Sequence, residues 1–446
     1  MGLKHIEQIK SVLLFVMVLL SITLTFSIWT YKPNYDPIEK TPPVPFSVEK
    51  KLRLVDVIKP YRMVFHENGE WRGTDRYDEM KSILNQMQSW QVSNPVLVSN
   101  NMNSTRVNRL VSGDNQFTLF FPGEIPYSIF RSLLPTSQDK VIDMSFNQMI
   151  VGWNQLSNTE ELTVLFVNTT KKQVYKAKIH VNSESIFMKQ VVEQSHNLEE
   201  YMAFTREQGS TIYLPAKEST MVKYTYLIST SSIERFKNAL FLNTKIVKNS
   251  VDDATAEENY TDGVSMMTVN NNKRVLDFVN TAASDHPDVL DKSKLILNTF
   301  DFINQHGGWT GDFRYDSLNI DTNKVVYQLY MQDYPVYADS LVTSTQIETI
   351  WGNNDIARYI RPYYKLVSVP ENEALTIMNG QGVVAELMKS NIVDFNDIEE
   401  IRAGYFVTKN DRPNVFILKP TWFYLINGKW TALSPTNIGG DQVGLE

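Results

Sequence analysis

Residues 306–309 (HGGW) come closest, by residue type and spacing, to known catalytic machinery. A His-Gly-Gly loop forms the oxyanion hole of some esterases, where backbone amides stabilise a developing negative charge. That chemistry needs a nucleophilic serine on a G-x-S-x-G elbow, and the sequence contains no such elbow. We therefore interpret the two glycines as a turn packed among the aromatic residues Phe302, Trp309 and Phe313.

Residues 380–385 (GQGVVA) imitate the G-x-G-x-x-G/A fingerprint of dinucleotide-binding proteins. The fingerprint holds a phosphate only inside a βαβ unit, after a buried strand and at the start of a helix. We find no apolar strand before Gly380 and no surrounding βαβ pattern, so we interpret the glycines as the opening of a helix.

Side chains that bind metals or transfer protons are scattered along the chain. Cysteine is absent, which excludes disulfides, thiolate metal sites and cysteine nucleophiles. The six histidines are isolated, and residues 394–397 (DFND) lack the glycine and glutamate of an EF-hand loop, so Asp394 or Asn396 is expected to cap a short helix. A pair of catalytic carboxylates far apart in the chain stays open, although nothing singles one out. We predict no catalytic residue, no cofactor and no metal site.

The amino-acid composition excludes further classes of protein. Of the 446 residues, 42% are hydrophobic, which suits packed cores and excludes wholesale disorder. The net charge of −7 argues against a nucleic-acid binder, because no basic surplus is available to neutralise phosphates. The length corresponds to about three domains.

Residues 12–29 (VLLFVMVLLSITLTFSIW) carry no charge and would span about 27 Å as a helix, enough for the core of a bilayer. Trp29 and Tyr31 fall where an interfacial aromatic belt would lie. A cleaved signal peptide is the alternative, but its apolar region is usually shorter and ends in a small-residue processing site, which is missing here. We predict a single-pass helix in the cell membrane that stays uncleaved. Residues 1–11 would be cytoplasmic, and the bulk of the chain extracytoplasmic.

The rest of the sequence predicts an α+β fold with antiparallel sheets. A proline-rich spacer at residues 30–50 is followed by three expected domains at 51–137, 138–287 and 288–446. Short turns such as Asn68-Gly69 between strand-like runs favour hairpins over crossovers.

The expected second and third domains show the same order of three strands, one helix and two strands. This order suggests a duplicated topology, without any residue-level repeat. The helix of the second domain is predicted to run from Ser183, as its N-cap, to Phe204.

Several motifs taken together resemble the YycH family, which comprises extracytoplasmic accessory proteins of the YycG/YycF (WalK/WalR-type) two-component system of Gram-positive bacteria. The resemblance covers essentially the whole chain and is strongest after Thr299. It is carried by the start at residues 5–11 (HIEQIKS), by 299–309 (TFDFINQHGGW), 312–314 (DFR), Tyr330, 334–336 (YPV), 351–352 (WG) and the aromatic ending 420–424 (PTWFY).

The resemblance implies a membrane-anchored regulator without catalytic residues. Its implied partners are a sensor histidine kinase of the YycG/WalK type and a sister accessory protein of the YycI type, which the family contacts largely through transmembrane helices. It also implies three outer domains, the last two similar to YycI. The implied role is to set kinase activity in cell-wall homeostasis.

One face of the predicted transmembrane helix is a candidate for that contact. Leu14, Val18, Ser21 and Thr25 share a face, and Ser21 with Thr25 forms a small-xxx-small pair that permits close backbone approach. The alternative, that these hydroxyls bond to carbonyls of their own helix, is equally compatible with the sequence. A cell-envelope hydrolase and a divisome scaffold remain the alternatives to a kinase regulator.

Overall fold

The computed structural model divides the chain into two compact units, Met1–Phe46 and Ser47–Glu446. The residues that it describes are 13–25, 51–131, 142–181, 183–206, 209–283, 290–353, 355–389, 393–410, 412 and 414–433.

In the first unit the structure describes one helix, at residues 13–25, whose side chains are all exposed. The two ends of the predicted transmembrane segment 12–29 lie outside the described residues, as do the tail 1–11 and the spacer 30–50. Within the described ranges, none of the helices combines the length and the apolar character that crossing a membrane requires.

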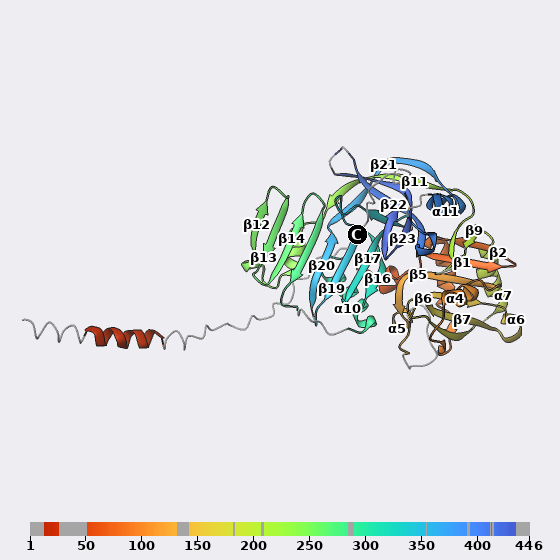
Figure 1. Ribbon diagram of the computed structural model, residues 1–446, viewed down its shortest axis with the longest axis horizontal. Helices are drawn as coiled ribbons and strands as arrows, with labels where there is room; N and C mark the ends of the chain where they lie inside the picture. Colours follow the sequence, from red (N-terminus) through yellow and green to blue (C-terminus); the bar gives the residue numbers. More distant parts are fainter. Residues whose placement is uncertain are drawn as a thin grey trace, which may run out of the picture. The chain divides into compact units, whose positions relative to one another are not determined.

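The second unit begins with an antiparallel sheet of ten described strands in the order β10-β9-β2-β1-β5-β6-β7-β8-β3, with β4 also paired to β8 (Figure 1). Its strands are β1 (Arg62–Glu67), β2 (Glu70–Thr74), β3 (Gln91–Val92), β4 (Val96–Ser99), β5 (Gln116–Pro126), β6 (Ser145–Gly152), β7 (Glu161–Asn168), β8 (Gln173–His180), β9 (Glu199–Phe204) and β10 (Ile212–Pro215).

The second sheet has fourteen described strands, and its main path runs β12-β13-β14-β15-β20-β19-β17-β18-β22-β23-β11-β21. Its strands are β11 (Ser219–Thr230), β12 (Lys248–Asp252), β13 (Glu257–Thr261), β14 (Ser265–Asn270), β15 (Val275–Asn280), β16 (Asp312–Asn319), β17 (Lys324–Met331), β18 (Tyr334–Ala338), β19 (Gln346–Trp351), β20 (Ile356–Pro362), β21 (Tyr364–Ile377), β22 (Glu400–Lys409), β23 (Val415–Ile426) and β24 (Lys429–Ala432). Its pairs are antiparallel except β18 with β22, which run parallel.

Short helices connect and cover these strands. They are α2 (Leu54–Val57), α3 (Tyr77–Met87), α4 (Ser104–Val111), α5 (Tyr127–Phe130), α6 (Leu156–Thr159), α7 (Glu184–Phe187), the π-helix η1 (Met188–Val192), α8 (Glu193–Ser195), α9 (Ile233–Leu240), α10 (Lys292–Gln305), α11 (Gly380–Lys389) and the 3₁₀ helices η2 (Thr244–Ile246) and η3 (Phe395–Asp397). The prediction of an α+β fold with antiparallel sheets is therefore confirmed, apart from the one parallel pair.

Local turn chemistry explains the first hairpin. Asn68 and Gly69 have φ angles of 53° and 78°, and both angles suit the tight turn that joins β1 to β2. A type I′ turn needs positive φ at both positions, which asparagine and glycine tolerate best. The predicted Asn68-Gly69 hairpin is confirmed.

The sheets do not follow the predicted domain boundaries. Gln138 and Asp288, at the boundaries, lie outside the described residues, but β5 pairs with β6 across the first and β15 with β20 across the second. The sheets change between Pro215 and Ser219. Buried apolar residues of both sheets belong to one contiguous core. The three domains and their duplicated topology remain predictions, and strand pairs cross both predicted boundaries.

The prediction of one long helix from Ser183 to Phe204 is wrong for the second half of that segment. Helical structure ends at Ser195, and residues 199–204 form β9, which pairs with both β2 and β10. Ser183 does cap the helix by accepting a hydrogen bond from the amide of Ile186. Pairing with two neighbouring strands outweighs the helical periodicity of this segment.

Candidate functional site

The HGGW stretch forms the end of a helix. The amide of His306 closes the last helical turn onto the carbonyl of Phe302 at 2.8 Å, and the amide of Gly308 donates to Ile303 at 2.9 Å, the six-to-one bond of a Schellman cap. Gly307 takes the left-handed conformation, with φ of 97°. The His306 ring stacks on Phe302 with centroids 4.0 Å apart, and burial lowers the pKa of His306. The interpretation as a packed turn is confirmed.

The Gly380 stretch opens α11, as predicted. A Cβ at Gly380 would lie 2.4 Å from the Cβ of Leu214, so glycine is required for close approach to β10. A strand does precede it, since β21 ends at Ile377, but residues 372–377 of that strand are exposed or half-buried and do not form the buried apolar strand that the fingerprint needs. That strand pairs antiparallel with β11, so a parallel βαβ unit does not form here.

In the described part of the chain, no group of three or more histidine and acidic side chains is placed to hold a metal ion. His66 stacks on Trp71 with centroids 3.8 Å apart, and the adjacent Glu67 pairs with His196 at 2.8 Å. Asp394 accepts a hydrogen bond from the amide of Asn396 at 2.8 Å, which confirms the predicted cap.

The predicted contact residues of the first unit, Leu14, Val18, Ser21 and Thr25, all lie within the helix at residues 13–25 and are exposed. The Thr25 hydroxyl donates to the carbonyl of Ser21 at 2.8 Å. The alternative of a bond within the helix therefore holds for Thr25. Such a hydroxyl keeps its lone pairs, so Thr25 can still accept a bond from a second helix.

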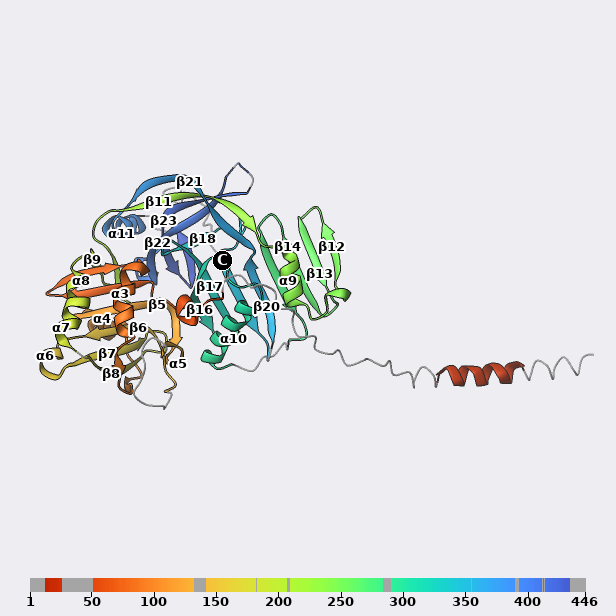
Figure 2. The same cartoon turned by 180° about the vertical axis from the view of Figure 1, so that it is seen from behind.

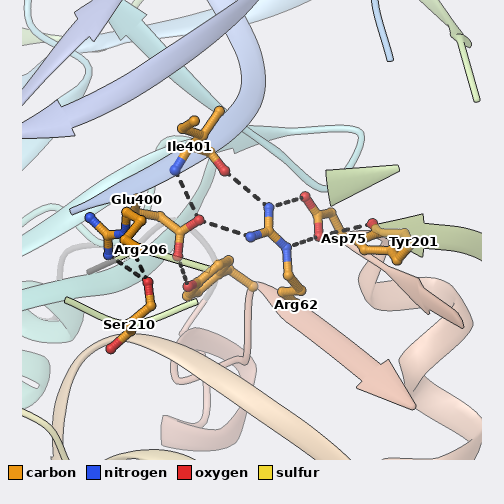
Figure 3. Close-up of polar contacts among 8 residues, drawn as sticks. Arg62, Asp75, Tyr201, Arg206, Ser210, Glu400 and Ile401 are labelled. Carbon is orange, nitrogen blue, oxygen red and sulfur yellow. Dashed lines mark hydrogen bonds and ion pairs between the residues drawn. The ribbon is translucent and has the colours of Figure 1, made fainter. Parts of the chain in front are cut away.

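A buried ion network joins β1 of the first sheet to β22 of the second (Figure 3). Arg62 is only 1% exposed. Its guanidinium donates two bonds to Asp75, at 2.7 and 2.9 Å, one to Glu400 at 2.8 Å and one to the carbonyl of Ile401 at 3.1 Å. All five donors of an arginine lie in one plane, which suits this bridging of two carboxylates.

Two tyrosine side chains also contact the charged groups of this network. The Tyr61 hydroxyl donates to the second oxygen of Glu400 at 2.6 Å, and the Tyr201 hydroxyl donates to Asp75 at 3.2 Å. The guanidinium carbon of Arg402 lies 3.4 Å from the centre of the Tyr61 ring, a cation–π contact. Two cations, Arg62 and Arg402, thus balance two carboxylates.

The charges determine what this site is able to do. Burial alone would raise the pKa of Glu400, but Arg62 and Arg402 outweigh it and hold the pKa below its usual value. Glu400 is therefore ionised at neutral pH and holds no proton to give to a substrate. The network is a lock between the two sheets and not an acid–base pair.

Further polar contacts connect the same two sheets. The Tyr315 hydroxyl in β16 donates to the carbonyl of Glu124 in β5 at 2.6 Å, and the Glu124 carboxylate pairs with Lys292. The amide of Asp78, at the start of α3, donates to Asp333 at 3.1 Å. Each contact joins a residue on the side of the first sheet to a residue on the side of the second sheet. Together these contacts hold the two sheets in one arrangement.

Arg314 bridges a second pair of carboxylates. It donates to Asp312 at 2.7 Å and to Asp333 at 2.6 Å. Both carboxylates face one guanidinium, which is the arrangement of a structural ion cluster. A hollow of about 600 Å³ elsewhere is lined by apolar side chains such as Phe204, Val384 and Met388 and, to a similar extent, by the polar residues Thr205, Arg206, Asp394 and Asn396.

Arg62, Asp75, Glu400 and Arg402 were not among the predicted functional residues. One signal was available for Arg62, because it precedes Met63, Val64 and Phe65 in a strand whose first four residues are all buried. A charge at the head of such a run needs a buried partner. The identity of that partner, more than 330 positions away, follows only from the fold.

The chain is similar to known proteins in both sequence and fold. Family models described as "YycH protein, N-terminal domain" and "YycH protein, C-terminal domain" match residues 7–195 and 209–437. A Bacillus subtilis (strain 168) protein described as "Two-component system WalR/WalK regulatory protein YycH" is 25% identical over 439 residues, 95% of each chain. The crystal structure of YycH from Bacillus subtilis, 21% identical, has the same fold, with a TM-score of 0.73 over 87% of this chain and 99% of that one.

Proposed function

The chain belongs to the YycH family, and from this membership we propose that it regulates a WalR/WalK-type two-component system without catalysing a reaction. The observation that carries the proposal is the extent of the match. The Bacillus subtilis relative, which is named as a regulatory protein of that system, aligns with 95% of this chain. Because the alignment covers nearly the whole of both chains, we infer the regulatory role for the whole chain and not from one shared domain.

The geometry of the second unit supports a binding role over an enzymatic one. Its buried carboxylate Glu400 is neutralised by Arg62, and Asp312 and Asp333 share Arg314. These polar groups fix two sheets relative to each other. A rigid body suits a protein that presents surfaces to partners, whereas an active site needs groups left available for a substrate.

We propose further that residues 12–29 anchor the protein in the cell membrane as a single-pass helix. The absence of charge over this stretch supports it, and so does the helical structure at residues 13–25. The N-terminus would be cytoplasmic and the folded unit extracytoplasmic. The anchor would place the protein beside the membrane-bound sensor kinase and a YycI-type partner.

The Leu14–Val18–Ser21–Thr25 face is the proposed contact with a helix of the kinase or of the YycI-type protein. In lipid, apolar burial gives little net gain between helices, so close approach and hydroxyl bonds matter more. Each such bond contributes about 0.6–2 kcal/mol, so the contact is expected to tolerate single changes.

Replacing Ser21 and Thr25 together with leucine should weaken association with the kinase by about tenfold while preserving insertion, since two hydroxyl bonds of this size are lost. Bacterial two-hybrid signal and a reporter of the kinase regulon, in a deletion strain complemented with each full-length variant, provide the measurement. The matched control replaces Thr23 and Ser27 on another face.

Loss of association in the Thr23/Ser27 variant, with the Ser21/Thr25 variant unchanged, would place the contact on the other face. An unchanged reporter in the deletion strain itself would refute the proposed function.

A further inference from the structure

The strand β4 lies at the outer edge of the first sheet. β8, which Figure 2 labels next to β7, pairs with β3 and β4 along one side. Among the strands that the structure describes, β4 pairs with β8 alone, so its second side faces outward.

The side chains of this edge are unusual for a strand that faces water. Val96, Leu97 and Val98 are 64%, 44% and 59% exposed. Natural edge strands are normally protected by lysine, proline or an inward-pointing charge, because an uncovered edge pairs with another chain. Pro95 protects the beginning of β4, and a shift in register between Leu97 and Ser99 interrupts its pairing, but the three consecutive aliphatic side chains are not covered.

The surroundings of β4 are basic, although the whole chain carries a net charge of −7. The two segments that build the edge, residues 91–113 and 162–183, contain no aspartate or glutamate. Their cationic side chains are Arg106, Arg109, Lys171, Lys172, Lys176 and Lys178.

Most of these charges are not used inside the molecule. Lys178 pairs with Glu161 at 2.5 Å. Lys171, Lys172 and Lys176 are exposed and form no ion pair with any described residue. Lys176 lies directly across from Val96 in the strand register. Positive charge is therefore placed at the apolar edge itself.

We propose that β4 binds an extended, acidic segment of another protein by strand addition. The outward side of β4 would supply backbone hydrogen bonds, Val96 and Val98, the residue at the register shift, would contact apolar side chains of the segment, and the lysines would pair with its carboxylates. A second copy of this chain is disfavoured as the occupant, because it would bring the same lysines against one another. The inference goes beyond the proposed function, since it concerns the folded unit and not the membrane helix.

The test uses the full-length protein in detergent micelles and a fluorescent peptide of about ten residues that alternates valine and glutamate. Fluorescence anisotropy measures its dissociation constant. Two control peptides carry lysine in place of glutamate, or proline at two central positions. We expect the glutamate peptide to bind at least about tenfold more tightly than either control.

Variants of the protein locate the site. Val96→Lys with Val98→Lys should weaken binding of the glutamate peptide by at least about tenfold, because lysines protect the edge. Leu341→Lys with Val264→Lys, which adds the same charge at residues 75% and 50% exposed, should leave it unchanged. Lys172→Glu with Lys176→Glu should reverse the preference toward the lysine peptide.

Equal binding of all three peptides, or equal loss in both double-lysine variants, would overturn the proposal. Dimerisation in sedimentation experiments that disappears in the Val96/Val98 variant would assign the edge to a second copy instead. Binding of phosphatidylglycerol vesicles that depends on Val96 and Val98, without peptide binding, would assign it to a lipid surface.

Discussion

Arg62→Met lowers the free energy of unfolding by about 3–5 kcal/mol, one of the largest losses that we expect from any single substitution in the folded unit. The side chain is 1% exposed and bridges Asp75 and Glu400. Its removal leaves both carboxylates beside apolar groups without their main counter-charge. Methionine fills much of the vacated volume, so the loss reports the charge and not a cavity. Urea unfolding followed by tryptophan fluorescence measures it.

Arg358→Met is the matched control. Arg358 also holds a carboxylate with two bonds, to Asp277 at 3.0 and 2.7 Å, but its side chain is 46% exposed. Water compensates for the lost partner there, so the expected cost is about 1 kcal/mol or less. Equal losses for the two substitutions would contradict the claim that Arg62 locks the two sheets together.

Gly307→Ala destabilises the protein by about 2–4 kcal/mol, because backbone strain and steric overlap act at one position. Gly307 has a φ of 97°, and a Cβ there would lie 2.4 Å from a ring carbon of Phe236. Phe236 is 1% exposed and Arg361 packs over its ring, so the ring has little room to move. The thermal midpoint and the urea midpoint should both fall.

Gly428→Ala separates the two causes. Gly428 has a φ of 71° in the turn between β23 and β24, and a Cβ there meets no atom within 4 Å. We expect only the backbone strain, about 1 kcal/mol. If Gly428→Ala costs as much as Gly307→Ala, packing against Phe236 does not explain the requirement for glycine at the end of α10.

The features predicted correctly depend on neighbouring residues. The Asn68-Gly69 hairpin and the Asp394 cap follow from the conformational preferences of a few adjacent residues. The same holds for the glycine turn that ends α10 at residues 306–308. Local chemistry of this kind is readable from the sequence because the partners lie within a few positions.

One missed element was readable. α10 begins after Asp291, whose side chain accepts bonds from the amides of Ser293 and Lys294, and it buries Leu295 and Ile303 among other apolar residues on one face. An N-cap followed by apolar residues at helical spacing is a recognised start signal.

The inter-sheet network was not predictable in the same way. Arg62 and Glu400 meet because β1 and β22 belong to different sheets that pack against each other, and nothing near either residue specifies the other. The segment 199–204 became a strand for a similar reason, since β2 and β10 supply its partners. Long-range pairing decides such positions against local propensity.

We propose that this chain changes the activity of a sensor kinase and that the membrane helix proposed at residues 12–29 takes part. The most direct measurement is autophosphorylation of a WalK-type kinase in lipid nanodiscs, with and without the full-length chain in the same disc. We expect the chain to change the rate of autophosphorylation, and we expect that replacing residues 12–29 with an unrelated transmembrane helix removes most of the change. An identical rate with and without the chain, at confirmed co-incorporation, would contradict it.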